Sequence, residues 1–490
     1  MPAAGMALGL TVFFGIYIFG GFAEPKAVAM AAVAALMAVW WITEAVPIAV
    51  TSLLPLVLFP LLGILDSGAT AGEYFNDTIF LFFGGFLIAI AMQRSNLHKR
   101  IALMIIRGVG AGPNRIILGF MLASASLSMF ISNTATAIML LPIGLSVIIK
   151  MEESAGSAES HNFSVALMLA IAYSASAGGL ATYVGTPPNL VFRHVYHDAF
   201  PGVPEITFAG WMAFGVPVSI AVLAMVWLFL TKILFRQSGD LFKLDKSLIR
   251  KEYQSLGAMK SEEKASAMAV VIASALWIFR KEINLGFASI PGWASALPSG
   301  EMIGDGTIAI VVAFALFLIP ARNIGSGRGR LLDESAFSKI PWHIIILFGG
   351  GFALAEGFQS SGLDAVVGGA FRGIADYPEW LLIFLNCIGI TFLTELTSNT
   401  AITQTILPIL ASVSQATGIN PLTLMVPATL SASCAFMLPV ATPPNAIVFG
   451  SGRLRIIEMA RAGIMINIAG AALITLIFIV LGGLLPGKAF

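Results

Sequence analysis

Hydrophobic residues in this sequence occur in long unbroken runs that are separated by short polar stretches. The runs at 7–22, 27–42 and 308–320, for example, contain no charged residue. A helix needs about 20 apolar residues to cross a bilayer, and each of these runs is near that length or somewhat under it. The pattern predicts a polytopic helical membrane protein. Because the first run belongs to a series, we interpret it as a membrane span and not as a cleaved signal peptide.

Eleven apolar runs are predicted to cross the membrane, at about 7–22, 26–43, 46–65, 78–94, 163–184, 210–235, 264–280, 304–320, 342–358, 421–441 and 463–485. Two further apolar segments, 113–149 and 379–414, are each long enough to enter the membrane and return, and each carries Ser-Asn-Thr near its midpoint. We predict that both are re-entrant helical hairpins, because non-helical backbone at membrane depth requires surrounding protein or a water-filled cavity. The predicted fold class is therefore an all-α polytopic membrane protein.

The composition agrees with a membrane location and says little about partners. Hydrophobic residues make up 58% of the chain and charged residues 11%, whereas a soluble domain carries about 25% charged residues. The formal net charge is +1, and no basic patch suited to nucleic acid is present, so nucleic acid is not expected as a partner.

Lysine and arginine are concentrated in four connections, 94–115, 232–264, 321–341 and 452–461, which all fall on one side of the membrane in this arrangement. The positive-inside rule assigns that side to the cytoplasm. We therefore predict a multi-pass protein of the inner (plasma) membrane, with a cytoplasmic N-terminus and an extracytoplasmic C-terminus.

One polar motif occurs at the centre of both predicted hairpins. Ser-Asn-Thr-Ala at 132–135 recurs at 398–401, an offset of 266 residues. An upstream block of phenylalanine and glycine, which begins at Phe82 and again at Phe348, keeps the same offset. Two motifs at one fixed offset indicate that the chain contains an internal duplication.

A second polar motif repeats downstream. Gly-Thr-Pro-Pro-Asn at 185–189 matches Ala-Thr-Pro-Pro-Asn at 441–445, and this third match in the same order strengthens the case for duplication. Five predicted crossings separate the two hairpins, so the first hairpin enters from the cytoplasm and the second from outside. Such an inverted-topology repeat is the plan of many secondary transporters, whose binding sites lie near the midplane where the repeats meet.

The repeated motifs suit the binding of an anion together with cations. Ser, Asn and Thr are helix N-caps, so each Ser-Asn-Thr should end a turn and begin a half-helix whose free N–H groups attract a carboxylate or another oxyanion. The paired prolines should unwind the crossings at 185–189 and 441–445 and leave carbonyl groups free as ligands for a hard cation. The sequence predicts one oxyanion site and one cation site in each half.

The two kinds of site are expected to depend on one another. A helix N-terminus stabilises an anion by about 0.3–2 kcal/mol, whereas removing water from an isolated carboxylate costs up to tens of kcal/mol. Neither repeated motif contains Lys or Arg. Bound cations, most simply Na⁺, should therefore supply the missing positive charge, and this requirement would couple substrate binding to cation binding.

Small polar residues and prolines also occur in membrane helices for packing alone, but duplication of both motifs in register favours a binding role. Glu395 lies beside the second Ser-Asn-Thr, and its positional counterpart in the first half is Met129. Because the acid is not duplicated, we expect it to orient its hairpin and not to bind ligand directly.

Two other patterns are interpreted structurally. His194 and His197 form a His-x-x-His pair that we place in an exposed loop with no further ligand nearby, so no metal site is predicted there. Four tryptophans near the ends of predicted spans are interpreted as membrane-interface anchors: Trp40, Trp41, Trp211 and Trp342.

The motif residues resemble those of the divalent anion/sodium symporter (DASS) family over essentially the whole chain. The segments that carry the resemblance are 41–55, 128–142, 185–189, 394–408 and 441–445. The resemblance implies a homodimer and an elevator mechanism, in which a transport domain that carries both hairpins slides against a dimeric scaffold. It also implies transport of C4 dicarboxylates, or of citrate or sulfate in some members, usually with several Na⁺.

The resemblance further implies roles for individual residues. Expected substrate contacts are Ser132, Asn133, Thr134, Thr186, Ser398, Asn399, Thr400, Thr442 and Pro443. The first sodium site is expected to comprise Ser128, Ser132, Asn133 and Gly185, and the second Thr394, Thr397, Asn399 and Ala441, the second largely through backbone oxygens. One departure is Thr186, where the family often has Ser; the hydroxyl is kept but the pocket is slightly crowded.

The same resemblance suggests a division into domains. Residues 1–112 and 264–378 are expected to be the scaffold helices of the two halves. Residues 113–235 and 379–490, each with a hairpin and a broken helix, are expected to form the transport domain, and 236–263 to be a cytoplasmic linker.

The function predicted from the sequence is sodium-coupled symport of a C4 dicarboxylate (succinate, malate or fumarate) into the cytoplasm by an elevator mechanism. No cofactor is expected, and Na⁺ is the coupling ion. The alternatives are a sodium-independent di- or tricarboxylate exchanger of the same fold and a sulfate or citrate transporter. An enzyme is disfavoured because the five histidines fall in loops or at span ends, and a channel is disfavoured by the inverted repeat.

Overall fold

The computed structural model describes residues 2–21, 24–110, 112–155, 157–236, 247–284, 289–321 and 329–485. These residues are almost entirely helical, as the apolar runs predict. The first half contains α1 Pro2–Phe19, α2 Pro25–Thr43, α3 Ile48–Thr51, α4 Leu54–Leu61, α5 Ser67–Gly72, α6 Asp77–Arg94, α7 Leu97–Val109, α8 Pro113–Ser128, α9 Asn133–Ala155, α10 Ser157–Gly179, α11 Pro187–Ala199 and α12 Phe208–Leu228, which continues into a π-helical turn at Phe229–Leu234.

The later helices of the second half follow the order of α6 to α12 in the first half. It contains α13 Ser247–Ser255, α14 Ser261–Ile278, α15 Asp305–Leu318, α16 Trp342–Ser361, α17 Leu363–Ala370, α18 Glu379–Leu393, α19 Asn399–Thr417, α20 Pro421–Ala432, α21 Pro443–Phe449 and α22 Ile456–Leu481. A two-stranded antiparallel pair, β1 Ile283–Asn284 and β2 Ser289–Ile290, lies between α14 and α15. Short 3₁₀ turns occupy Trp293–Ala296, Gly300–Met302, Glu334–Lys339, Arg372–Asp376 and Gly482–Leu484.

The predicted crossings all fall on helices, with one difference of detail. Among the described residues, seven helical segments are long and apolar enough to cross a membrane, and one of them is the second arm of the first hairpin, Asn133–Glu153. The run predicted as a single crossing at 46–65 is instead two short helices, α3 and α4. Pro55 in the first turn of α4 explains the difference, because it lacks the N–H that a helix continuous with α3 would require.

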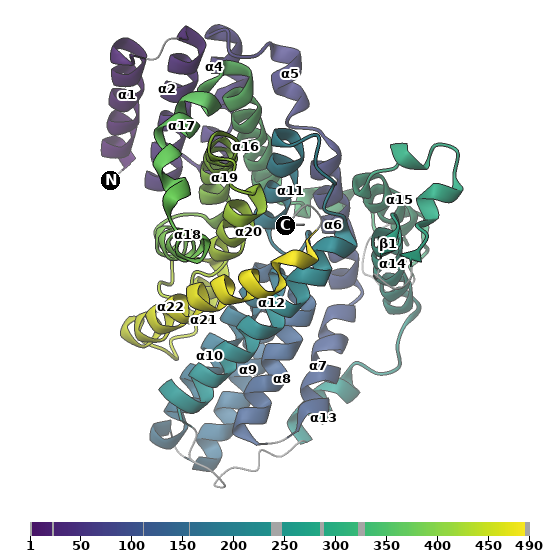
Figure 1. The fold of residues 1–490 in the computed structure, drawn as a ribbon. Helices are drawn as coiled ribbons and strands as arrows, with labels where there is room; N and C mark the ends of the chain where they lie inside the picture. The colour runs from purple at the N-terminus through teal and green to yellow at the C-terminus, as the bar shows by residue number, and fades with distance from the viewer. Residues whose placement is uncertain are drawn as a thin grey trace.

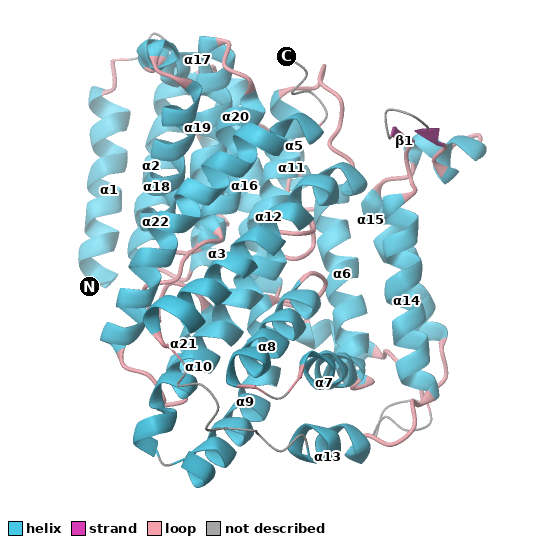
Figure 2. Cartoon of the chain, turned by 60° about the horizontal axis from the view of Figure 1, so that its bottom comes forward, coloured by secondary structure: helices cyan, strands magenta, loops and turns pink. Residues whose placement is uncertain are grey.

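The two predicted hairpins are present and approach from opposite ends of the molecule. α8 and α9 form the first hairpin, and α18 and α19 form the second. Both views draw the first hairpin in the lower part of the molecule and the second in the upper part (Figures 1 and 2). This arrangement confirms the inverted repeat that the odd number of intervening crossings predicts.

Helices from the two halves interlock around the hairpins. α21 packs against α9 and α10, α11 packs against α19 and α20, and α12 packs against α22. α1 and α2 stand at one side of this group, and the pair α14 and α15 stands at the other (Figure 1). α6 runs along α15, while α2 contacts α16. The ends of the broken helices are thereby held at the centre of the protein.

Connections that are rich in Lys and Arg are joined by ion pairs. Arg94 at the end of α6 lies 2.9 Å from Asp333, and Arg100 on α7 lies 3.0 Å from Glu263 at the start of α14. Hydrogen bonding to Arg94 and Ser335 lowers the pKa of Asp333 to about 2, so this ion pair persists at neutral pH. Three of the four connections that the sequence assigns to one side are therefore neighbours in space, although residues 237–246 and 322–328 lie outside the described residues.

Candidate binding site at the two hairpin tips

Each hairpin turns at its Ser-Asn-Thr motif, as predicted. α9 begins at Asn133, and the Ser132 hydroxyl accepts a hydrogen bond from the Ala135 N–H at 3.3 Å. α19 begins at Asn399, but the Ser398 hydroxyl does not cap its helix. The capping prediction is therefore confirmed in the first half and wrong in the second, where the chain at Ser398 enters the helix without that bond.

The asparagine at each tip is held by a hydroxyl from the preceding arm. The Ser128 hydroxyl donates to Oδ1 of Asn133, and the Thr394 hydroxyl donates to Oδ1 of Asn399 at 2.6 Å. Ser128 and Thr394 are themselves equivalent at the offset of 266 residues. Because Oδ1 accepts these bonds, the amide NH₂ group of each asparagine remains available to donate to an oxyanion.

The broken helices unwind before their prolines and not at them. α10 ends at Gly179 and α11 begins at Pro187, whereas α20 ends at Ala432 and α21 begins at Pro443. Proline is favoured in the first turn of a helix, where its missing N–H would lack an intrahelical partner anyway. The prediction that the prolines unwind 185–189 and 441–445 is therefore wrong in position, since they start the second half of each broken helix.

The last residue of each Thr-Pro-Pro-Asn motif braces the unwound segment, a role that the sequence reasoning missed. Nδ2 of Asn189 donates to the carbonyls of Gly179 and Thr182, at 3.1 and 2.8 Å. Nδ2 of Asn445 donates to the carbonyls of Ala435 and Leu438, both at 3.1 Å. Repetition of this asparagine at the same place in both motifs was the available signal.

The residues predicted for the first sodium site lie together. A Cβ atom added to Gly179 would lie 3.0 Å from the carbonyl oxygen of Gly185 and 3.1 Å from Oδ1 of Asn133. The Ser128 hydroxyl bonds the same Oδ1. Hydroxyl, amide and carbonyl oxygens are ligands that hard cations prefer, so this group of atoms has the chemistry of a sodium site.

The second predicted sodium site is assembled less completely. The single hydroxyl hydrogen of Thr394 is shared between Oδ1 of Asn399 and the Ala432 carbonyl oxygen, which lie 2.6 and 2.9 Å from Oγ1. The Thr397 hydroxyl instead donates to the carbonyl of Trp41 on α2 at 3.3 Å. The Thr397 hydroxyl oxygen keeps its lone pairs when it donates, so both this oxygen and the backbone oxygen of Thr397 stay able to bind a cation.

A cavity of about 560 Å³ lies between the two tips and the two Thr-Pro-Pro-Asn motifs. Its volume is in the range of ordinary small-molecule sites. It is lined by eleven of the predicted site residues: Ser132, Asn133, Thr134, Gly185, Thr186, Ser398, Asn399, Thr400, Ala441, Thr442 and Pro443. Ser128, Thr394 and Thr397 lie behind the tips and do not line it.

The cavity attracts anions through helix N-termini and not through a positively charged side chain. α9, α11, α19 and α21 all begin at its wall, so four helix N-termini face the same space. N-termini carry partial positive charge, and those of α9 and α19 also offer free N–H groups, whereas α11 and α21 each begin with two prolines, which have no N–H. No Lys or Arg is among the described residues that line the cavity.

Two ionisable residues that line the cavity were not predicted. Glu44 caps the C-terminus of α2 with a positive φ of 45°, a conformation that is uncommon for residues other than glycine. His343, in the first turn of α16, also lines the cavity. The segment 41–55 that carries part of the family resemblance includes Glu44, but its spacing does not indicate that the chain turns back toward the hairpins there.

Glu395 has the orienting role that the sequence suggests. Its carboxylate accepts hydrogen bonds from the N–H groups of Phe436, Met437 and Leu438, at 2.6, 2.8 and 3.0 Å, and from Nδ2 of Asn467 at 2.7 Å. Glu395 does not line the cavity. It ties the unwound segment before α21 to the second hairpin tip. In the first half the Thr182 hydroxyl performs the same task by donating to the carbonyl of Met129.

Two of the structural interpretations are wrong. His194 does not lie in an exposed loop; it is buried on α11, close to the carboxylates of Glu73 and Asp198. Trp41 and Trp211 are also buried, and their indole N–H groups bond to Ser52 and to the Leu180 carbonyl. These indoles fix the backbone near the cavity and do not anchor the protein at the membrane surface.

Comparison with known proteins places these observations in a family. The family described as the sodium:sulfate symporter transmembrane region matches residues 10–485. Two sodium-dependent dicarboxylate transporters named SdcS, from Staphylococcus saprophyticus and Staphylococcus aureus, are each 44% identical to this chain over 456 residues, which is 92% of this chain and 85% of the relative. The fold is similar to the crystal structure of the YdaH transporter of Alcanivorax borkumensis, with a TM-score of 0.58, 14% identity, and coverage of 88% of this chain and 89% of that one.

Proposed function

Because this chain belongs to the sodium:sulfate symporter family, we propose that it carries a C4 dicarboxylate such as succinate, malate or fumarate into the cytoplasm together with Na⁺. The chain is a multi-pass membrane transporter and not an enzyme. Sodium is the coupling ion, and no cofactor is involved. The two relatives are named as dicarboxylate transporters, which supports a dicarboxylate over sulfate or citrate as the substrate.

One observation carries the proposal: both copies of both motifs line one cavity, and its lining contains no Lys or Arg in the part of the chain that the structure describes. A dianion in this cavity would meet four helix N-termini, each of which stabilises an anion by about 0.3–2 kcal/mol. That sum is small beside the cost of removing water from two carboxylates. Sodium ions bound next to the cavity would supply the remaining charge, so substrate would bind well only after Na⁺.

The duplicated tips suggest how the substrate is held. We propose that one carboxylate accepts hydrogen bonds from Asn133 and Thr134 and the other from Asn399 and Thr400. The remaining proposed contacts are Ser132, Thr186, Ser398, Thr442 and Pro443, all of which line the cavity. The distance between the two tips would then set the preferred length of the diacid.

The two sodium sites are proposed beside the tips. The first would use Ser128, Ser132, Asn133 and Gly185, and the second Thr394, Thr397, Asn399 and Ala441. The hydroxyl-to-amide bonds at both tips support this assignment, because each brings two oxygen atoms together as the ligands of one cation must be.

We also propose an elevator mechanism, in which 113–235 and 379–490 move as one transport domain against scaffold helices in 1–112 and 264–378, with 236–263 as the linker. The interlocking of α9, α10 and α21 and of α11, α19 and α20 supports the single transport domain. A homodimer held by the scaffold, a cytoplasmic N-terminus and an extracytoplasmic C-terminus belong to the same proposal.

Uptake of labelled succinate into proteoliposomes tests the proposed function. An inward Na⁺ gradient should drive accumulation, whereas choline or K⁺ at the same concentration should not. Uptake that ignores Na⁺ but accelerates with dicarboxylate trapped inside the vesicles would contradict symport and establish the exchanger. An excess of unlabelled malate should compete with succinate, and competition by sulfate alone would contradict the substrate class.

A further inference from the structure

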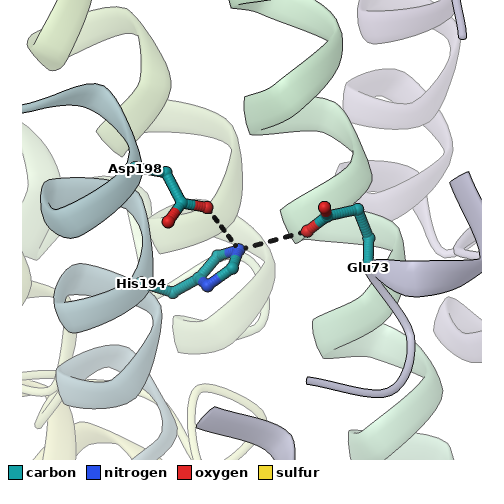
Figure 3. A group of neighbouring side chains, drawn as sticks. All are labelled: Glu73, His194 and Asp198. Atoms are coloured by element: carbon teal, nitrogen blue, oxygen red, sulfur yellow. Dashed lines mark ion pairs between the residues drawn. The ribbon is translucent and has the colours of Figure 1, made fainter. Parts of the chain in front are cut away.

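Three side chains from two separate parts of the chain meet outside the binding cavity. Nε2 of His194 on α11 lies 3.0 Å from Oδ2 of Asp198, one helical turn later, and 3.3 Å from Oε2 of Glu73, which caps the C-terminus of α5 (Figure 3). One nitrogen and one oxygen from each carboxylate all lie within 4.8 Å of one another. Neither the transport function nor the family comparison accounts for this cluster.

The spacing fits a first-row metal ion. Zn²⁺ binds histidine nitrogen and carboxylate oxygen at about 2.0–2.2 Å, so tetrahedral ligands lie about 3.3–3.5 Å from one another. The two distances from Nε2 are close to that separation. One imidazole and two carboxylates suit Zn²⁺ better than Ca²⁺ or Mg²⁺, which prefer ligand sets made only of oxygen.

The unsatisfied hydrogen-bonding capacity of these groups points the same way. His194 is 8% exposed, yet its Nε2 makes no well-directed hydrogen bond despite the nearby carboxylates. Oε2 of Glu73 is also buried and lacks one. Buried polar atoms are nearly always satisfied in native proteins. The two atoms lie 3.3 Å apart as an ion pair without hydrogen-bond geometry, and a shared metal ion between them would satisfy both.

The surroundings would hold the ligands in place. The ring of His194 lies against Phe352, with 3.6 Å between ring centroids. Nδ1 of His197 lies 3.3 Å from the other oxygen of Asp198, the kind of outer-shell contact that orients a ligating carboxylate. Glu356 on α16 interacts electrostatically with Glu73, Asp198 and His194. The cluster therefore carries more negative than positive charge, which a divalent cation would balance.

We propose that Glu73, His194 and Asp198 form a Zn²⁺-binding site that joins α11 to the segment between α5 and α6. In the proposed division into domains, α11 belongs to the transport domain and Glu73 to the scaffold. On that premise, which rests on the proposed function, a bound metal ion would hold the two domains together and stop transport.

Direct metal binding tests the site without reference to transport. Full-length protein is purified in detergent, treated with a chelator that is then removed, and titrated with ZnCl₂ by calorimetry. The wild type should bind one Zn²⁺ per chain. Loss of an outer-shell partner lowers metal affinity by about 10- to 100-fold. His194→Ala removes a direct ligand and should lower the affinity for Zn²⁺ by more than that. Glu73→Gln, which keeps the shape of the side chain, should lower it similarly.

His161→Ala is the matched control. His161 also faces a carboxylate, Glu458 at 2.8 Å, but no third ligand of the kind found in the cluster accompanies this pair among the described residues. This variant should bind Zn²⁺ like the wild type. The proposal would be overturned if the wild type did not bind Zn²⁺, or if both His194→Ala and Glu73→Gln bound it with wild-type affinity. His194 would then be a histidine that is ion-paired to two carboxylates and binds no metal. Size-exclusion profiles that match the wild type show that the variants are folded.

Uptake in the presence of Zn²⁺ separates the metal site from the transport mechanism. If α11 moves past Glu73, Zn²⁺ should inhibit succinate uptake by the wild type and by His161→Ala but not by His194→Ala. Stoichiometric Zn²⁺ binding without inhibition would leave the metal site in place and contradict movement of α11 relative to the scaffold.

Discussion

At the scale of single residues, each hairpin tip relies on one asparagine that lines the cavity and whose amide oxygen is held by a hydroxyl. A hydrogen bond to a charged group contributes about 1.5–3 kcal/mol, and 1.4 kcal/mol corresponds to a tenfold change in affinity. Asn133→Ala should therefore reduce sodium-dependent succinate uptake by about 10- to 100-fold or more, and Asn399→Ala should act alike. Initial uptake rates in proteoliposomes at matched protein content measure this effect.

Thr417→Ala serves as the control for this pair, because it also shortens a polar side chain of the second hairpin. Thr417 lies at the far end of α19, where its hydroxyl bonds the Val413 carbonyl. Its uptake should stay near the wild-type rate. Wild-type rates in Asn133→Ala would remove the first tip from the proposed mechanism.

The hydroxyl partners of these asparagines should be interchangeable between the halves. Ser128 holds Asn133 as Thr394 holds Asn399, so Ser128→Thr and Thr394→Ser should retain uptake. Ser128→Ala removes a bond of about 0.5–1.5 kcal/mol, and we expect it to raise the Na⁺ concentration for half-maximal uptake by about 2- to 10-fold. An unchanged Na⁺ dependence in Ser128→Ala would contradict the first sodium site.

Sequence reasoning succeeds at this scale where residues are adjacent in a repeated motif. All the predicted substrate contacts line one cavity because each motif is a contiguous tip or helix start. It fails where a side chain reaches several residues away, as Asn189 does to Gly179, or where folding of the chain decides the neighbours, as for His194 and Glu73. Local spacing carries no information about such contacts.

At the scale of elements, the unwound segment before α21 depends on one buried acid. Glu395→Ala would leave the N–H groups of Phe436, Met437 and Leu438 without their acceptor. Each buried unsatisfied donor costs about 1–3 kcal/mol. Glu395→Ala should therefore lower the thermal unfolding midpoint of the detergent-purified protein by several degrees, and Glu395→Gln, which keeps one carbonyl oxygen, should lower it less.

Glu301→Ala is the control for charge removal, because Glu301 is an exposed acid in the turn before α15. Its unfolding midpoint should equal that of the wild type. Equal midpoints for Glu395→Ala and the wild type would show that the unwound segment does not need the carboxylate.

The element boundaries explain which parts of the fold the sequence could predict. Long apolar runs predict the membrane spans. Because an odd number of spans separates the two hairpins, the sequence also predicts that the hairpins enter from opposite sides. The prolines before α3, in α4 and at the starts of α11 and α21 are harder to interpret, because proline is compatible with both a helix break and a helix start. Only the surrounding packing decides between these outcomes.

At the scale of the whole molecule, the direction of both hairpins depends on which end faces the cytoplasm. Ser255 at the end of α13 and Ser295 after α14 are both exposed, and they lie on opposite sides of the membrane in the predicted topology. The native cysteines, Cys387 and Cys434, are buried and should react little. In intact cells, an impermeant maleimide should label Ser295→Cys and spare Ser255→Cys, and the reverse pattern would invert the topology.

The central claim of this account is that Na⁺ supplies the positive charge that the cavity lacks. Equilibrium binding of labelled succinate to the purified protein tests it most directly, in NaCl and in choline chloride at equal ionic strength. The account predicts saturable binding of succinate in NaCl. The affinity for succinate should be lower by about tenfold or more in choline chloride. Equal affinity in the two salts would contradict the claim, because the helix N-termini alone would then suffice to bind the dianion.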